Sequence, residues 1–147
     1  KARKYIINPL MPIYRLLVRG NPKVGQTKVS RVLNGDSYRI INIDTLKSRS
    51  VLPDVLDRDG HPCSRGLRAG FFVTDTYPTR EGFQHLYLVE SASRTVCRID
   101  SIPSFPPVDE SILRCDLHPK TSNDGKLVAV DTMVEGIRGI KVYELIN

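Results

Sequence analysis

The histidines are the residues of this 147-residue chain best suited to chemistry. His61 and His118 each stand directly before a proline, and a third histidine, His85, follows Gln84 in an apolar stretch. Imidazoles at two matching positions could bind a metal ion or hydrogen-bond an acidic sugar. They could equally donate to the backbone of a neighbouring segment and lock two repeats together. The recurrence favours this structural role, because catalytic residues seldom recur from repeat to repeat, and His85 is expected to be an ordinary half-buried strand residue.

Two aspartates recur in the same way. Asp75 and Asp131 each precede a threonine at the end of an apolar run. A pair of carboxylates can divide acid and base roles when their environments separate their pKa values. A single carboxylate can instead accept hydrogen bonds from backbone amides, or pair with an arginine, and so close a loop. The recurrence favours this second interpretation.

Asp116 and Arg114 lie close to His118 in the sequence. Asp116 could orient the imidazole of His118, and Arg114 could bind a carboxylate ligand through two parallel hydrogen bonds. Arg114 could equally lie in solvent or in a salt bridge between repeats. The sequence assigns no catalytic residue; its candidate ligand-binding residues are His61, Arg114, Asp116 and His118, and its candidate metal ligands are His61 and His118.

These residues belong to an internal repeat. Residues 59–91 and 115–147 both contain His-Pro near the start, a polar turn, an apolar strand ending in Asp-Thr, a Glu-Gly pair and a final apolar strand with a tyrosine. A weaker copy precedes them, with Asn8-Pro9 in place of His-Pro and residues 14–18 in place of the Asp-Thr strand. Such a period is typical of stacked supersecondary units, which bury their faces only against neighbours.

The elements that must position these residues are strands. Ten prolines and ten glycines interrupt the chain, and no segment keeps helical apolar spacing for three turns. Apolar runs bounded by turn residues predict strands at 14–18, 28–33, 37–43, 70–74, 83–89, 94–99, 127–131 and 139–146. The first three should form one antiparallel meander, residues 123–126 an Asp-Gly hairpin turn, and the proline-rich residues 100–110 an extended connection. The last strand has no purely polar face, which predicts a sheet packed between two others.

The composition indicates a globular chain with a basic surplus. It is 40% hydrophobic and 26% charged, with a formal net charge of +6 and a pI near 9.4. This charge fits an ordinary soluble surface with surplus arginine, or an acidic partner, for which an acidic oligosaccharide is the candidate. The basic residues are scattered and do not alternate with aromatics, so nucleic acid is not expected. No apolar run is long enough to predict a membrane span, and the three cysteines, which lack metal-type spacing, are expected to be free buried thiols.

Four short segments resemble a known family: Asp59-Gly-His-Pro, Thr-Asp-Thr-Tyr-Pro at 74–78, Arg-Cys-Asp-Leu-His-Pro at 114–119 and Asn-Asp-Gly-Lys at 123–126. They resemble bacterial WD40-like or TolB-like β-propellers, and within these the relatives of oligogalacturonate lyase. The resemblance is good over residues 50–147. It implies an all-β chain of four-stranded antiparallel β-propeller blades at about 1–47, 48–103 and 104–147. The stretch Cys63–Gly70 departs from the family pattern, because its hairpin has lost the usual Asp.

The same resemblance sets the classes of function. Oligogalacturonate lyase holds manganese through a Gln-x-x-His-x-His arrangement and removes a proton α to a uronate carboxylate. This chain has three histidines and no such arrangement. The expected function is therefore a binding or scaffold module for an acidic carbohydrate or a protein, with a metal-dependent lyase using His61 and His118 as the alternative and a degenerate repeat without a site as a third hypothesis. Manganese is the candidate cofactor, and nothing in the sequence indicates a cellular compartment.

Three blades form an incomplete ring, because propellers close with about four to eight. An incomplete ring leaves two apolar sheet faces without neighbours. The chain is therefore expected to associate with itself or with another chain that supplies the remaining blades. Two copies would give a six-bladed ring with two-fold symmetry.

Overall fold

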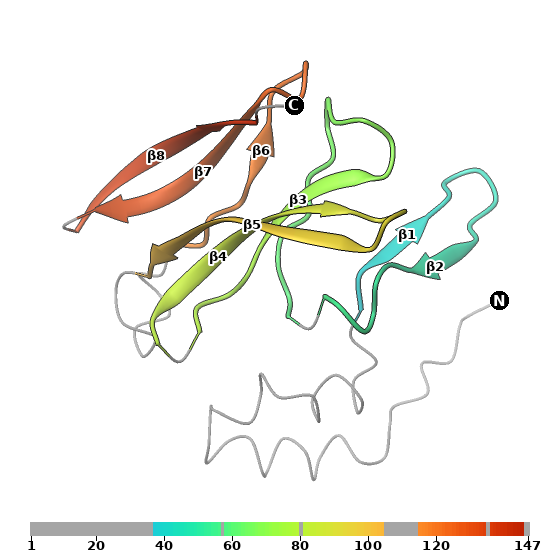
Figure 1. Cartoon of the computed structure of the whole chain (residues 1–147), viewed down its shortest axis with the longest axis horizontal. Coiled ribbons are helices and arrows are strands. Elements are labelled where there is room, and N and C mark those ends of the chain that lie inside the picture. Colours follow the sequence, from blue (N-terminus) through green and yellow to red (C-terminus); the bar gives the residue numbers. More distant parts are fainter. Residues whose placement is uncertain (1–36, 57, 80, 105–114, 135, 146–147) are drawn as a thin grey trace, which may run out of the picture. The chain divides into compact units, whose positions relative to one another are not determined.

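The computed structural model describes residues 37–145 apart from 57, 80, 105–114 and 135 (Figure 1). All the described elements lie in the unit Tyr38–Asn147. The expected strands at 14–18 and 28–33, and with them most of the meander, lie outside the described residues. Over the described part of the chain every regular element is a strand and the sheets are antiparallel, so the predicted all-β class is confirmed. None of these elements is a helix with the length and apolar character to cross a membrane.

The first described element is a hairpin of β1 (Arg39–Ile41) and β2 (Ser48–Ser50). Its turn is closed by Asn42, whose side-chain oxygen accepts hydrogen bonds from the amides of Asp44 at 3.1 Å and Thr45 at 2.7 Å. β1 lies in the expected strand at 37–43, whereas β2 has a polar sequence and was not expected. The expected boundary between the first two blades, at residues 47 and 48, falls between β1 and β2, which pair with one another.

The middle sheet consists of β3 (Phe71–Asp75), β4 (Phe83–Glu90) and β5 (Thr95–Pro103), in that order. An isolated bridge adds Cys63 to its edge, through two backbone hydrogen bonds of 2.8 Å to Val73. β5 continues through Asp100–Pro103, where an extended connection was expected. Pro103 is tolerated because it is the last paired residue of an outer strand, where a missing N–H costs little.

The last sheet consists of β6 (Lys120–Thr121), β7 (Leu127–Val134) and β8 (Ile137–Glu144), in that order. The predicted turn at 123–126 joins β6 to β7. Gly125 has a φ of 69°, and Asp124 accepts hydrogen bonds from Ser122 Oγ at 2.6 Å and from the Lys126 amide at 3.1 Å. A side chain at Gly125 would collide with the carbonyl oxygen of Gly66, so the polar turns of the two repeats lie in contact.

The repeat in the sequence is a repeat in the structure. The Cys63–Val73 bridge corresponds to the Lys120–Ala129 pair, β3 corresponds to β7, and β4 corresponds to β8. The two tyrosines that end the repeats in the sequence are not equivalent, because Tyr87 pairs with Thr74 whereas Tyr143 pairs with Val128. The connection between β7 and β8 is shorter than the connection between β3 and β4. The residue opposite the tyrosine is therefore displaced by two residues along the strand, to the next position on the same face.

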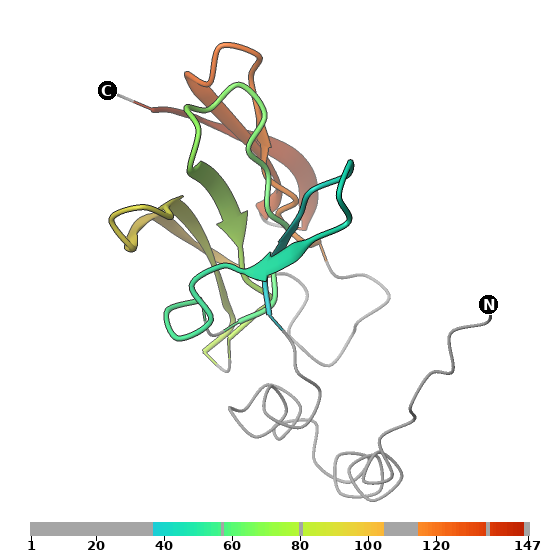
Figure 2. The same ribbon diagram turned by 90° about the vertical axis from the view of Figure 1, so that its right-hand side faces the viewer.

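The middle sheet lies between the other two sheets (Figure 1). In the turned view of Figure 2 the β1–β2 hairpin is nearest the viewer and the last sheet is behind the middle sheet. Side chains of β3 and β4 alternate between two apolar clusters. One cluster packs Val73 and Leu86 against the last sheet, and the other packs Phe72 and Val89 against the segment that follows β2. The middle sheet is therefore covered on both faces.

The last sheet is covered on one face. Val128 and Val130 of β7 join the cluster shared with the middle sheet. On the opposite face Ile140 and Val142 of β8 are 71% and 56% exposed. The described residues cover only one side of this strand, so the expected packing between two sheets is not seen within the described part of the chain.

Candidate functional site

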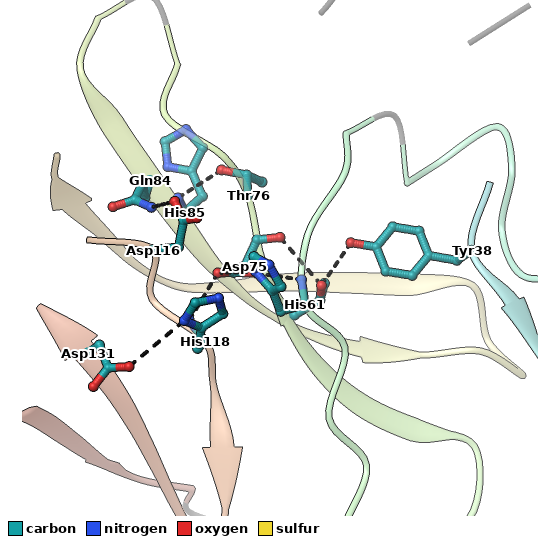
Figure 3. Close-up of polar contacts among 10 residues, drawn as sticks. Tyr38, His61, Asp75, Thr76, Gln84, His85, Asp116, His118 and Asp131 are labelled. Carbon is teal, nitrogen blue, oxygen red and sulfur yellow. Dashed lines mark hydrogen bonds and ion pairs between the residues drawn. The ribbon is translucent and has the colours of Figure 1, made fainter. Parts of the chain in front are cut away.

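A buried carboxylate joins the two repeats. Asp75, at the end of β3, is 1% exposed. Its Oδ1 accepts a hydrogen bond from the His61 amide at 2.6 Å, and its Oδ2 accepts one from the His118 amide at 3.2 Å (Figure 3). A carboxylate is stable in the interior when such donors replace water. Asp75 therefore closes the loop of its own repeat, as the sequence suggested, and also holds the first residues of the following repeat.

This contact brings the two histidine rings together. The ring centroids of His61 and His118 lie 4.2 Å apart at an interplanar angle of 69°, and Tyr77 packs edge-on against His61 at 5.6 Å. His118 has a φ of 42°, a left-handed conformation that is costly for a residue with a side chain. The hydrogen bond from its amide to Asp75 helps to hold this conformation. The equivalent positions predicted from the repeat thus form a pair at the junction of two repeats.

Each histidine faces the aspartate of its own repeat. His61 Nδ1 lies 3.1 Å from both carboxylate oxygens of Asp75, and His118 Nδ1 lies 3.9 Å from Asp131 Oδ2. The first separation is a hydrogen bond and the second is an ion-pair distance. An imidazole that donates from Nδ1 keeps the lone pair of Nε2 for another ligand. The hydrogen bond to Asp75 therefore orients the His61 ring and leaves its Nε2 for another ligand, whereas the His118 ring lies near Asp131 without a hydrogen bond to it.

Asp116 completes a group of three potential ligands. Gln84 of β4 is buried, and its Nε2 donates to Asp116 Oδ1 at 3.4 Å. One ligand atom from each of His61, Asp116 and His118 lies within 4.8 Å of the others. Two imidazoles and a carboxylate form a donor set that divalent first-row metals accept, manganese among them.

Three of the four predicted ligand-binding residues therefore meet at one place. Arg114 lies outside the described residues. His85 is half-buried on β4, as expected, with its Nδ1 2.9 Å from Ser101 Oγ. Burial lowers the pKa of His85, and the charges of Arg98 and Arg58 lower it further.

Sequence reasoning missed Gln84 and the polar link between β5 and β8. Gln84 could have been found as a lone amide in an apolar strand. The link could not, because Asp100 of β5 meets Lys141 and Tyr143 of β8 only in the folded chain, with Lys141 Nζ and Tyr143 Oη at 2.7 and 2.6 Å from Asp100 Oδ2. Hydrogen bonds from Lys141 and Tyr143 lower the pKa of Asp100 to about 2. Burial and the Asp100 carboxylate raise the pKa of Tyr143 to about 12.

The three cysteines are free thiols. Cys115 is buried and its pKa is raised by that burial, whereas Cys97 is exposed. The expectation of buried thiols is right for Cys115 and wrong for Cys97.

A separate groove of about 310 Å³ lies between the first hairpin and the middle sheet. Tyr38, Ile40 and Phe72 are among its lining residues. It is not lined by any of the predicted ligand residues, so the histidine pair and this groove are distinct features of the described structure.

No family model, no curated protein and no solved structure matches this chain. The resemblance to TolB-like propellers therefore stays a prediction from the motif residues. Function has to be argued from the geometry of the described residues alone.

Proposed function

We propose that this chain is a binding and scaffold module of the β-propeller type, which completes its stack of sheets by associating with a second copy of itself. The observation that carries the proposal is the difference in burial between equivalent residues of the two repeats. Leu86 and Leu88 of the middle sheet correspond in register to Ile140 and Val142 of the last sheet. Leu86 is fully buried against the last sheet, whereas Ile140 is 71% exposed.

The exposed face carries apolar side chains beside the charged residues Asp131, Arg138 and Glu144. Burying a valine, leucine or isoleucine side chain contributes about 1.5–3 kcal/mol relative to leaving it in water. The last sheet presents Leu127, Ile140 and Val142 on this face, and their exposure is 44% or more. A second copy is the chosen occupant because the same face in the preceding repeat is already occupied by a sheet of this kind.

Asp131 supports the same conclusion. It corresponds to Asp75, whose carboxylate binds the amide of His118 in the following repeat. The Asp131 side chain lies on the exposed face and is itself 55% exposed. A further repeat packed on the last sheet would bring a matching amide to this carboxylate.

The proposed module binds an acidic partner, which is either an acidic carbohydrate or a protein. The net charge of +6 supports this choice, because a surplus of positive charge attracts anions over the whole surface. Isothermal titration with oligogalacturonate should give binding that weakens as salt is added. Binding that is absent at low salt would remove the carbohydrate from the proposal.

The alternative function is a metal-dependent lyase that acts on acidic oligosaccharides by proton abstraction and β-elimination. The meeting of His61, Asp116 and His118 favours it. Its test is the ultraviolet absorbance of an unsaturated product when the chain is incubated with oligogalacturonate and manganese. A rise in absorbance would establish the lyase, and a flat trace would leave the binding module.

Size-exclusion chromatography with light scattering tests the association. The wild-type chain should show a mass above that of the monomer that increases with concentration. Ile140→Lys combined with Val142→Lys should give a monomer, because two charges would then face the apolar surface. Leu46→Asn is the matched control, since Leu46 is 77% exposed in the β1–β2 turn and Asn tolerates its positive φ. A wild-type chain that stays monomeric at every concentration would overturn the proposal.

A further inference from the structure

We propose that His61, Asp116 and His118 bind one divalent transition-metal ion, and that this ion joins two consecutive repeats. The inference concerns a single chain and does not depend on the proposed association. His61 belongs to the repeat of the middle sheet, whereas Asp116 and His118 lead into β6 of the last sheet. The ligands also differ from the Gln-x-x-His-x-His arrangement of the lyase family, which this sequence lacks.

The separation of the three groups suits one ion. Their ligand atoms all lie within 4.8 Å of one another. Bonds from zinc to imidazole nitrogen or carboxylate oxygen are about 2.0–2.2 Å, so two ligands on opposite sides of an ion lie about 4 Å apart. Rotations of side chains that are partly or largely exposed close the remaining difference.

The surrounding residues hold the ligands in place for binding. Asp75 accepts from His61 Nδ1, Asp131 lies near His118 Nδ1, and Gln84 donates to Asp116. Carboxylates and amides in such positions orient metal ligands and make imidazole a stronger donor. Two of these three supporting side chains, Asp75 and Gln84, are 1% exposed, so the support is built into the core rather than the surface.

The chemistry of the converging atoms favours a cation. The tautomer in which His61 Nδ1 donates to Asp75 leaves a lone pair on His61 Nε2. One nitrogen of each imidazole and one oxygen of Asp116 lie close together, and such a set of donor atoms can bind one divalent cation jointly. Two nitrogen donors and one oxygen donor suit zinc, cobalt, iron or manganese better than magnesium, which prefers oxygen ligands.

Thermal unfolding of the full chain tests the site. Saturating Zn²⁺ should raise the Tm by roughly 5 °C or more over the protein in chelator, and Mg²⁺ should not. Asp116→Asn and His118→Asn should each abolish most of the shift. Asn in place of Asp116 keeps an oxygen for Gln84, and Asn at position 118 tolerates the positive φ of 42°. His85→Gln, which removes an imidazole outside the group, should leave the shift unchanged.

Visible absorbance of the Co²⁺ complex provides a second measurement. Nitrogen and oxygen ligation should give d–d bands without the intense near-ultraviolet band of a cobalt thiolate. Such a spectrum would exclude the half-buried Cys63 as a ligand. A Tm shift that survives both Asn variants, or a thiolate band that disappears in Cys63→Ser, would overturn the site. A shift that is lost in His118→Asn but kept in Asp116→Asn would remove Asp116 from it.

Discussion

The middle sheet and the last sheet are built from the same repeat, yet their outer environments differ. Both start after a His-Pro segment and both carry an aspartate at the matching position of β3 or β7. Leu86 is fully buried in the middle sheet, whereas its counterpart Ile140 is 71% exposed. The comparison teaches that burial in this architecture is decided by the neighbouring repeat more than by the residue itself.

The aspartates show the same dependence on a neighbour. Asp75 accepts a hydrogen bond from the amide of the following repeat and is buried, whereas the Asp131 side chain is 55% exposed and lies 3.9 Å from His118 Nδ1. One sequence position thus serves as an interior lock in the first case and as a surface group in the second. The predictions below test this asymmetry, and the largest expected effect comes first.

Truncation of the equivalent residues Leu86 and Ile140 should give the largest difference in free energy of unfolding between the middle sheet and the last sheet. Leu86→Ala should lower the free energy of unfolding by about 3 kcal/mol, because it leaves a cavity in the shared core. Ile140→Ala should cost less than about 0.5 kcal/mol in dilute protein, because the side chain is already in water. Urea unfolding measures both values, and equal losses would show that the exposed face is covered within one chain.

Replacement of Asp75 and of Asp131 should give a smaller difference in the free energy of unfolding, again with the larger loss in the middle sheet. Asp75→Asn should cost about 2 kcal/mol, because its amide group cannot accept from the amides of both His61 and His118. Asp131→Asn should change stability little, since the Asp131 side chain is 55% exposed and lies 3.9 Å from His118 Nδ1, and exposed contacts of this kind contribute about 0–1 kcal/mol. The same urea experiment applies, and a larger loss for Asp131→Asn would break the comparison.

The hydrogen bonds of Asp100 to Lys141 and Tyr143, which link β5 to β8, should make a still smaller contribution to stability, and this contribution depends on pH. The folded-state pKa of Asp100 is lowered from 3.8 to about 2, so its ionised form adds stability above pH 4 that is lost as the pH falls from 4 through 2. We expect a loss of about 1 kcal/mol, because the side chain is partly exposed. Asp100→Asn should flatten this part of the stability profile.

Asp54 provides the control for that pH dependence. Its pKa is also lowered, by a hydrogen bond from Arg94, but both side chains are exposed and join no sheets. Asp54→Asn should therefore leave the acid profile of unfolding close to wild type.

At the alkaline end, Tyr143, whose pKa is raised to about 12, should contribute stability that is lost as the pH rises from 10 through 12.

Much of the strand pattern could be predicted from the sequence because turn residues and apolar runs act locally. The turn at 123–126 and the strands β3, β4 and β7 follow from such signals. β2 and β6 do not, because Ser48–Ser50 and Lys120–Thr121 carry no apolar pattern and become strands only by pairing with a neighbour.

The site could be predicted only in part. The recurrence of His61 and His118 and the place of Asp116 beside His118 in the sequence singled out three residues that the structure brings together. The hydrogen bond from the His118 amide to Asp75 could not be predicted, because the sequence does not show which repeat supplies the donor. Gln84 could have been singled out as a lone amide in an apolar strand, but its partner Asp116 could not, because Asp116 lies in the other repeat.

Hydrogen exchange measured at two protein concentrations tests the central claim most directly, because it compares the two sheets in one experiment. If a second copy packs on the last sheet, the amides of residues 137–144 should exchange more slowly in concentrated than in dilute protein. The amides of residues 83–90, whose sheet is covered on both faces within one chain, should exchange at the same rate in both. Identical exchange of residues 137–144 at the two concentrations would contradict the account.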